Sequence, residues 1–398
     1  MTRHTVIITD GEQRASLAVV RSLGAGGYRC VVTCSSHGSI AGASRFVART
    51  VRVPNALDQP LEFADAIVAL VATERAAVVL PIAEQSLLAV LPVRDRLSPA
   101  IVPFADHASF IQLTDKERLL EEASKLGIAI PAQVIVRDVD AVASMDFSTL
   151  QYPIVVKPAR SVSERAGVRT AFSVTYASDA TELHRKVGAL PAAAFPLLLQ
   201  QRVVGPGTGI FLLLWDGKVK AQFAHQRLSE KPPSGGESVY RESVSIDEGL
   251  RDRSRALLDR FGWRGVAMVE YKRDAATGQP YLMEVNGRFW GSLQLAIDSG
   301  VDFPRILVAC ALGEHSQEMP SYRTGVRSRW WWGQIDHLVG RVRRSGAKDP
   351  LPPNTRSARR AVGDLLLGPL RRADYEEVLR WTDPGPFWSE TIRWIARR

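Results

Sequence analysis

The sequence has little cysteine and no long apolar run, and each shortage excludes a class of protein. Only three cysteines, Cys30, Cys34 and Cys310, occur among 398 residues, too few for a disulfide framework. Cys30 and Cys34 also lack the further ligands of a zinc site. No apolar run approaches the roughly 18 residues that a membrane-spanning helix needs. The first residues, "MTRHTVIITDGEQ", hold too short an apolar core for a secretory signal. Together these absences predict a cytoplasmic protein.

The positive charge of the sequence is concentrated near its C-terminal end. The formal net charge is +9. Residues 323–398 hold 16 Lys and Arg against 8 Asp and Glu, so this segment alone carries +8 and the rest is close to neutral. Charge confined to the tail says little about what the main body binds, and nucleic acid binding is not expected. The composition, 45% hydrophobic and 23% charged, is typical of a globular protein. The length predicts roughly two to four domains.

Strands and helices alternate over about the first 105 residues. The apolar strand "TVIIT" precedes a helical pattern that ends at Gly24, Gly26 and Gly27, and "RCVVTCS" predicts the next strand. The stretch "AAVVLPIAEQSLLAVLPVRDRL" repeats the order of strand and helix. This alternation predicts an α/β domain with a doubly wound parallel sheet. No G-x-G-x-x-G follows the first strand, so a dinucleotide site is not expected there.

The middle of the chain mixes helices with strands that are suited to hairpins. Residues 106–130 are expected to be helical, with Thr114 or Asp115 as the N-cap of the clearest part and Gly127 as its end. The stretch "YPIVVKPA" predicts a strand that leads into a polar loop at residues 160–170. Two hairpins follow, one turning at an Asp-Gly pair and the other formed by "GVAMVEYKRDAATGQPYLMEVN".

The second hairpin gathers oxygen ligands on one face. Glu270 and Glu284 lie on its two strands, and Asn286 and Arg288 follow Glu284 at intervals of two residues. Side chains two positions apart on a strand share a face, so the two carboxylates and the amide oxygen can face one point. Such a set suits Mg²⁺ or Mn²⁺, with phosphate oxygens and water completing the coordination. The alternative is an ordinary solvated face of an amphipathic sheet.

Cations that could neutralise a polyphosphate stand on separate predicted elements. Lys157 ends an apolar strand, Lys116 opens a helix, and Arg227 and Arg288 follow strands. Phosphoryl transfer depends mostly on positioning and charge neutralisation, so scattered cations beside magnesium ligands are the parts that it requires. Each cation alone is typical of a protein surface, and it is their order along the chain that favours a nucleotide site.

A series of motifs resembles the ATP-grasp superfamily over roughly residues 1–312. These motifs are "DKERLL", "YPIVVKPA", "LLLQQRVVGPGTG", "AMVEYK" and "LMEVNGR", and "HQRLSEKPPSGGES" further resembles a poorly characterised bacterial branch. The resemblance implies an N-terminal Rossmann-like domain before a two-lobed ATP-grasp domain. The expected division is a first domain at 1–105, a small lobe at 106–200, a metal-binding lobe at 201–312 and a mainly helical extension at 313–398.

The resemblance also implies roles for individual residues. Lys116 and Lys157 would hold the ATP phosphates, and Arg288 would stabilise the transferred phosphoryl group or the acyl-phosphate. Arg227 is similar to a basic residue that faces the triphosphate or the carboxylate substrate. The hinge that contacts adenine and ribose would be Gln200, Gln201, Arg202 and Val203, and the metal ligands would be Glu270, Glu284 and Asn286.

Two positions depart from the pattern of the superfamily. Gln201 stands where many members have a glutamate near the ribose, although an amide can still accept a hydroxyl proton. Gly167 is the single glycine of the loop that follows Lys157, where many members carry a glycine-rich cover over the phosphates. The segment "KPPSGGES" could share that covering role.

The function that the resemblance implies is an ATP-dependent carboxylate–amine ligase. A small-molecule carboxylate would attack the γ-phosphate to give an acyl-phosphate and ADP, and a small-molecule amine would then displace phosphate. Two alternatives stay open: a small-molecule kinase that stops at phosphorylation, and a nucleotide-binding module without turnover. His225 is a candidate base, although a lone histidine on a strand is more often structural.

The C-terminal extension holds six of the nine tryptophans and most of the net charge. These aromatic residues are expected to pack against the ATP-grasp core or a second subunit, and a homodimer is a reasonable default. Alternatively, Trp388, Ile392 and Ile395 fall on one helical face with arginines nearby, a pattern that would suit peripheral contact with an anionic membrane surface.

Overall fold

The chain begins with a parallel four-stranded sheet, seen in a computed structural model that describes residues 4–165, 168–233, 235–314, 319–343, 357–367, 371 and 374–397. Its strand order is β3-β2-β1-β4, and every pairing is parallel, as the alternation of strands and helices predicts. The strands are β1 (Thr5–Ile8), β2 (Arg29–Cys34), β3 (Val47–Arg52) and β4 (Val78–Leu80). The helices are α1 (Arg14–Ala25), α2 (Pro60–Glu74), α3 (Glu84–Val90) and the 3-10 helix η1 (Leu91–Leu97).

Two helices link this domain to a small antiparallel lobe, where a single helical region was predicted. They are α4 (His107–Thr114) and α5 (Lys116–Lys125). The chain leaves helical geometry at Asp115, whose side chain accepts from the Arg118 backbone amide, so the predicted N-cap is confirmed. Gly127, at φ +67°, follows the end of α5, as expected. The break at Asp115 also lets the Lys116 amide donate to the Ala159 carbonyl at 2.8 Å, which ties α5 to the small lobe.

The small lobe has a hydrophobic core of its own. Its sheet has the order β5-β10-β6-β9, with strands β5 (Gln133–Val136), β6 (Ile154–Pro158), β9 (Thr175–Ala177) and β10 (Leu197–Gln201). The helices α6 (Val139–Ser144) and α7 (Ala180–Gly188) and the short 3-10 helix η2 (Ala192–Ala194) complete the lobe. Phe147, Ile154, Leu183 and Leu199 belong to this core, which is separate from the main core of the molecule.

The segment predicted as a polar loop after β6 is instead a hairpin. Strands β7 (Val162–Arg165) and β8 (Val168–Ala171) pair antiparallel. Glu164 stands opposite Arg169, which donates to it at 2.8 Å, and such opposite charges stabilise a cross-strand pair. Polar composition alone therefore misassigned this segment. Gly167, which was singled out in the same segment, lies outside the described residues.

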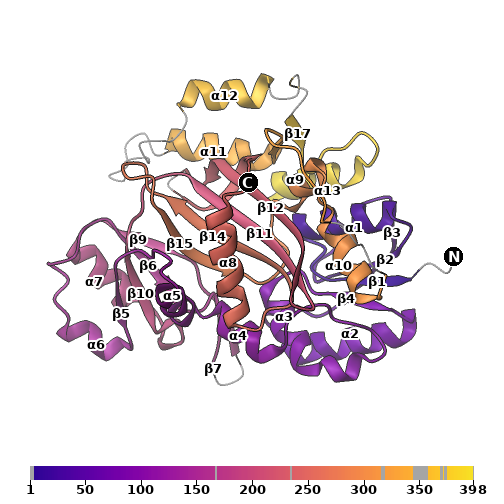
Figure 1. Cartoon of the computed structure of the whole chain (residues 1–398), viewed down its shortest axis with the longest axis horizontal. Coiled ribbons are helices and arrows are strands. Elements are labelled where there is room, and N and C mark those ends of the chain that lie inside the picture. The colour runs from indigo at the N-terminus through magenta and orange to yellow at the C-terminus, as the bar shows by residue number, and fades with distance from the viewer. Residues whose placement is uncertain are drawn as a thin grey trace.

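A seven-stranded sheet in the order β15-β14-β11-β12-β13-β16-β17 forms the centre of the molecule, between the small lobe and the N-terminal domain (Figure 1). Its strands are β11 (Gly207–Trp215), β12 (Lys218–Lys231), β13 (Glu237–Ser243), β14 (Gly265–Arg273), β15 (Pro280–Asn286), β16 (Arg327–Arg329) and β17 (Asp374–Glu376). Helices α8 (Glu248–Arg260), α9 (Leu293–Ser299) and α10 (Phe303–Ala311) belong to the same part of the chain. The N-terminal domain and this sheet share one continuous hydrophobic core.

The C-terminal extension is mainly helical, as expected, and β16 and β17 add it to the edge of the central sheet. Its helices are α11 (Trp331–Arg343), α12 (Ala358–Leu367) and α13 (Gly385–Ala396). Trp332 stacks on Trp394 with ring centroids 4.1 Å apart, so these aromatic residues hold α11 and α13 together. Trp388, Ile392 and Ile395 are instead exposed on α13, and membrane contact through them stays a prediction. Within the described residues, no helix is long and apolar enough to cross a membrane.

Candidate functional site

The two predicted carboxylates face each other across the β14–β15 hairpin. Glu270 on β14 stands directly opposite Glu284 on β15. The Asn286 amide donates to Glu284 Oε1 at 3.0 Å, and Arg288 Nη2 donates to Asn286 Oδ1 at 3.0 Å. The strand ends at Asn286, yet Arg288 still turns back to the same face. Alternation along β15 correctly predicted that Glu284 and Asn286 share a face, whereas Glu270 stands opposite Glu284 through a register shift between Glu270 and Tyr271.

Lys116 and Lys157 approach the carboxylates from two other elements. Lys116 is the first residue of α5, and its Nζ donates to Ser161 Oγ at 2.8 Å. Lys157 lies near the end of β6 and lines the same cleft as Glu284. Burial acts to raise the pKa of Glu284, but the charges of these lysines and the Asn286 hydrogen bond hold it below its ordinary value. Glu284 is therefore ionised at neutral pH.

For Glu270 and Lys157, burial outweighs the neighbouring charges, and the pKa of each group shifts so as to disfavour its charged form. Burial raises the pKa of Glu270, with Arg227 opposing and the negative charge of Glu284 adding to the shift. Burial likewise lowers the pKa of Lys157, although the charge of Glu284 opposes this. Burial therefore disfavours the charged forms of both groups, and an added cation or polyphosphate at this point would favour them.

Arg227 connects the carboxylates to the loop that follows β12. Its Nη2 donates to Glu270, and its Nη1 donates to Glu230 Oε1 at 3.0 Å and to the Gly236 carbonyl at 3.1 Å. The Arg227 side chain is 12% exposed, so its position is fixed by these partners. Arg227 is therefore a largely buried side chain that contacts one of the candidate metal ligands, Glu270.

Glu230 is a site residue that the sequence reading missed. On a regular strand it would point away from Arg227, because residues three apart lie on opposite faces. Register shifts at Arg227/Ser229 and Ser229/Glu230 in the β12–β13 pairing bring the two side chains together. No alternation pattern could have signalled this. Glu84, at the start of α3, lines a small cavity together with Lys116 and Glu284.

Of the predicted hinge residues, Arg202 approaches a residue that lines the cleft. The Gln200 amide is buried and donates to Gln133 at 2.8 Å, and Gln201 donates to Gln151 at 2.9 Å. The Arg202 guanidinium lies 5.4 Å from the ring centroid of Tyr176, and Tyr176 lines the cleft. The roles of Gln200, Gln201, Arg202 and Val203 in holding adenine and ribose stay predictions.

One cleft of about 770 Å³ brings most of these groups together. Its walls include Lys157, Arg227, Glu270, Glu284, Asn286 and Arg288, while Lys116 lines the adjoining small cavity. Two carboxylates and an amide oxygen on facing strands are hard oxygen donors, and the flanking cations suit phosphate. The residues present therefore fit Mg²⁺ together with a nucleoside triphosphate.

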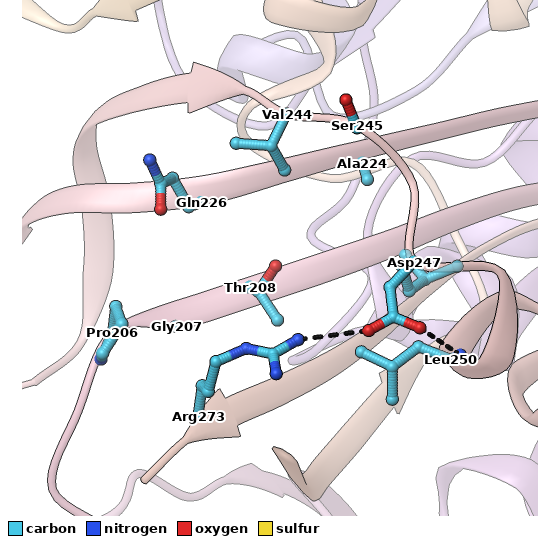
Figure 2. A pocket seen from close by; sticks show the side chains of 11 residues that line it. Pro206, Gly207, Thr208, Ala224, Gln226, Val244, Ser245, Asp247, Leu250 and Arg273 are labelled. Atoms are coloured by element: carbon cyan, nitrogen blue, oxygen red, sulfur yellow. Dashed lines mark hydrogen bonds and ion pairs between the residues drawn. The ribbon is translucent and has the colours of Figure 1, made fainter. Parts of the chain in front are cut away.

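A smaller pocket lies on the other face of strands β11 and β12 (Figure 2). Its volume is about 150 Å³, and its walls include Thr208 and Gln226. Gln226 precedes Arg227 on β12, so its side chain points to the opposite face of the sheet. Figure 2 shows Arg273 donating to Asp247, at 3.4 Å. In the described part of the chain, none of the predicted site residues lines this pocket.

His225 lies at the edge of the cleft and is almost fully buried. Its Nε2 is 3.1 Å from Ser292 Oγ, and its ring stacks on Phe211 with centroids 4.7 Å apart. Burial, with the positive charges of Arg227 and Arg241, holds the pKa of His225 well below its ordinary value. The imidazole is therefore neutral, and its role as a base stays a prediction.

Comparison with protein families gives a match for one part of the chain. Residues 195–333 match a family described as "ATP-grasp in the biosynthetic pathway with Ter operon". The matched segment begins just before β10 and ends within the first turn of α11. It includes the β14–β15 hairpin and the loop that carries Gly236.

Solved structures resemble most of the chain in fold. An L-amino acid ligase from Bacillus licheniformis is 18% identical with a TM-score of 0.63, over 82% of this chain and 79% of that protein. An N5-carboxyaminoimidazole synthetase from Staphylococcus aureus, complexed with ADP, is 14% identical with a TM-score of 0.61, over 80% of each chain. A biotin carboxylase from Campylobacter jejuni is 14% identical with a TM-score of 0.62, over 81% and 74%.

Proposed function

The chain has the ATP-grasp fold that its sequence motifs predict, and on this premise we propose that it is an ATP- and magnesium-dependent carboxylate–amine ligase. The observation that carries the proposal is the convergence on one cleft of the Glu270–Glu284 pair and cations from separate elements. Those cations are Lys157 of the small lobe and Arg227 and Arg288 of the central-sheet lobe, with Lys116 in the adjoining cavity.

The nucleotide end of the cleft is assigned to the lysines. We assign Lys116 and Lys157 to the phosphates of ATP, because both stand beside an ionised Glu284 that would otherwise repel a triphosphate. Glu270, Glu284 and the Asn286 oxygen would hold Mg²⁺, which supplies charge neutralisation on the phosphates when bound. The segment from Gln200 to Val203 would contact adenine and ribose.

The arginines are assigned to the carboxylate that is activated. Arg288 and Arg227 orient a substrate carboxylate, whose oxygen attacks the γ-phosphorus of ATP. The new oxygen–phosphorus bond gives an acyl-phosphate, and ADP leaves with the electron pair of the broken bond. A neutral amine then attacks the acyl carbon, phosphate leaves, and the amide nitrogen loses one proton to water. Activation is needed because a carboxylate is a poor electrophile.

The comparisons support a choice of substrates for the first assay. One of the similar structures is an L-amino acid ligase, and another was solved with ADP. These names describe those proteins, and they make amino acids a sensible pool to test. Substrate pockets are built from loops, which vary on a shared fold, so the particular carboxylate and amine have to be found by experiment.

The proposal is tested by measuring ADP release with Mg²⁺ and ATP against pooled amino acids and small carboxylic acids. The wild type is compared with Glu284→Ala, and turnover is expected to fall by at least about a hundredfold in the variant. A ligase requires both an acid and an amine. ADP release with a stable phosphorylated product and no need for an amine would instead favour a kinase. ATP binding without turnover in any pool would contradict both enzymes and favour a binding module.

A further inference from the structure

The far end of the cleft, beyond the carboxylate pair, is built from residues that the proposed mechanism does not use. Arg14 opens α1, Glu237 opens β13, and residues 290–292 follow the metal-ligand strand. All of them line the same cleft as Glu270 and Glu284. The cleft therefore continues from the nucleotide side toward a second group of charged residues.

Glu237 is the accessible carboxylate of this end. Its side chain is 50% exposed, whereas the side chain of its partner Arg14 is 6% exposed. Arg14 Nη2 donates to Glu237 Oε1. Partial burial acts to raise the pKa of Glu237, but the charge of Arg14 holds it below its ordinary value. Glu237 is therefore an ionised carboxylate that presents half of its surface to solvent.

Glu237 is connected to the proposed reacting groups through the residue that precedes it in the sequence. The preceding residue, Gly236, accepts a hydrogen bond from Arg227 through its carbonyl at 3.1 Å, and Arg227 donates to Glu270 as well. One arginine thus joins the metal-ligand side of the cleft to the residue before Glu237. A group held at Glu237 would lie beside the carboxylate that Arg227 is proposed to orient.

Gly291 packs closely against the Arg14–Glu237 pair. A Cβ atom at position 291 would lie 3.1 Å from Arg14 Nη2 and 3.6 Å from Glu237 Oε1. Any larger residue would therefore press against the pair. The absence of a side chain at this position lets the chain after the metal-ligand strand pass close to Arg14 and Glu237 without displacing them.

Residues of the C-terminal extension hold Arg14 in place at this end of the cleft. Arg14 Nη1 donates to Glu377 Oε2 at 2.6 Å, and the Arg14 guanidinium lies 3.9 Å from the centroid of the Trp330 ring. A guanidinium over an aromatic face is stabilised by the charge distribution of the ring. Arg14 is therefore held in place, and it in turn holds Glu237.

We infer that Glu237 binds the ammonium group of the amine substrate, with Arg14 as the residue that positions it. The inference deepens the proposed function and rests on it. A free amine is mostly protonated in water at neutral pH, and a half-exposed carboxylate in a cleft is the partner that an ammonium group requires. The bound amine loses one proton to water before its nitrogen attacks the acyl carbon.

The test compares a charged acceptor with an uncharged one. Wild type, Glu237→Gln and Glu237→Asp are incubated with Mg²⁺, ATP and a mixture of L-amino acids as carboxylate donors. L-Amino acid methyl esters serve as charged acceptors, since they offer an amine without a free carboxylate. Hydroxylamine, uncharged at neutral pH, serves as the other acceptor. The matched control is Glu248→Gln, a glutamate on α8 whose side chain is 80% exposed.

The expected result is a selective loss. Product formation with the methyl esters falls by about tenfold or more in Glu237→Gln, while hydroxamate formation stays within about twofold of wild type. Glu237→Asp, which keeps the charge, retains part of the ester reaction, and Glu248→Gln changes neither. Equal losses with both acceptors, or no loss with the esters, would overturn the subsite. A wild type that forms no hydroxamate at all would instead overturn the proposed function.

Discussion

Arg14, the first residue of α1, donates to Glu377 near the other end of the chain at 2.6 Å. The side chains are 6% and 2% exposed, and the buried Arg241 also donates to Glu377. Glu377 follows β17, the last strand of the central sheet. The C-terminal extension is therefore joined to the N-terminal domain through a buried charge cluster, which lies behind one end of the cleft.

Replacing Glu377 by alanine is expected to destabilise the whole protein. The change leaves two buried arginines without their shared carboxylate, and breaking a buried pair in this way costs about 3–5 kcal/mol. Urea unfolding of wild type and Glu377→Ala measures the difference. Glu248→Ala, at an exposed position of α8, serves as control and should stay within about 0.5 kcal/mol of wild type. A Glu377→Ala protein as stable as the control would show that the cluster contributes nothing.

Replacing Lys157 by methionine is expected to separate binding from stability. Burial lowers the pKa of Lys157, so keeping the lysine charged in the folded protein reduces the free energy of unfolding. We expect Lys157→Met to be no less stable than wild type in urea, because a buried ion often gains nothing over an apolar residue of similar size. Loss of a charged phosphate contact should weaken ATP binding by about 10- to 100-fold. Calorimetric titration with ATP that shows unchanged affinity would remove Lys157 from the site.

Glutamine at Glu270 is expected to raise the requirement for magnesium. The substitution keeps the shape of the side chain, removes the charge and leaves Glu284 opposite. The Mg²⁺ concentration for half-maximal ADP release should increase by about tenfold or more. Titration of Mg²⁺ at fixed ATP measures this shift. The same curve for the variant and for wild type would mean that Glu270 is not a ligand.

His225 is expected to make the folded state sensitive to acid. The pKa of His225 is lowered in the folded state. Below about pH 6.5 the imidazole therefore binds a proton in the unfolded chain but stays neutral in the folded chain. The stability that His225 contributes is therefore present above about pH 6.5 and falls by up to about 1.4 kcal/mol per pH unit below it. Urea unfolding at several pH values between about 5 and 7.5 should show a shallower slope for His225→Gln. Parallel slopes would contradict this account.

The metal-ligand hairpin could be predicted in part. Glu270 stands opposite Glu284 only because of a register shift between Glu270 and Tyr271 in the β14–β15 pairing, which no sequence pattern carried. The shared face of Glu284 and Asn286 was predictable because alternation along β15 is local. The Asp216-Gly217 turn was predictable for a similar reason, since both residues take positive φ angles, 50° and 70°, that this dipeptide tolerates.

Other features depend on relationships that a local pattern does not carry. Glu230 reaches Arg227 only because two register shifts in the β12–β13 pairing turn its side chain to the same face. Arg14 and Glu377 are far apart in sequence, and no local motif around either residue predicts that the two side chains pair. The β7–β8 hairpin was missed because its composition is as polar as that of a loop, and the cross-strand pairing of Glu164 with Arg169 leaves no local signal.

The acyl-phosphate step is the central claim, and oxygen transfer tests it most directly. Wild type is incubated with Mg²⁺, ATP, an amine mixture and L-amino acids whose carboxylate oxygens are ¹⁸O. Because the carboxylate oxygen that attacks ATP leaves with phosphate, the account predicts one ¹⁸O atom in the inorganic phosphate, detected by mass spectrometry. Phosphate that carries no ¹⁸O, formed while the amide product accumulates, would contradict the account.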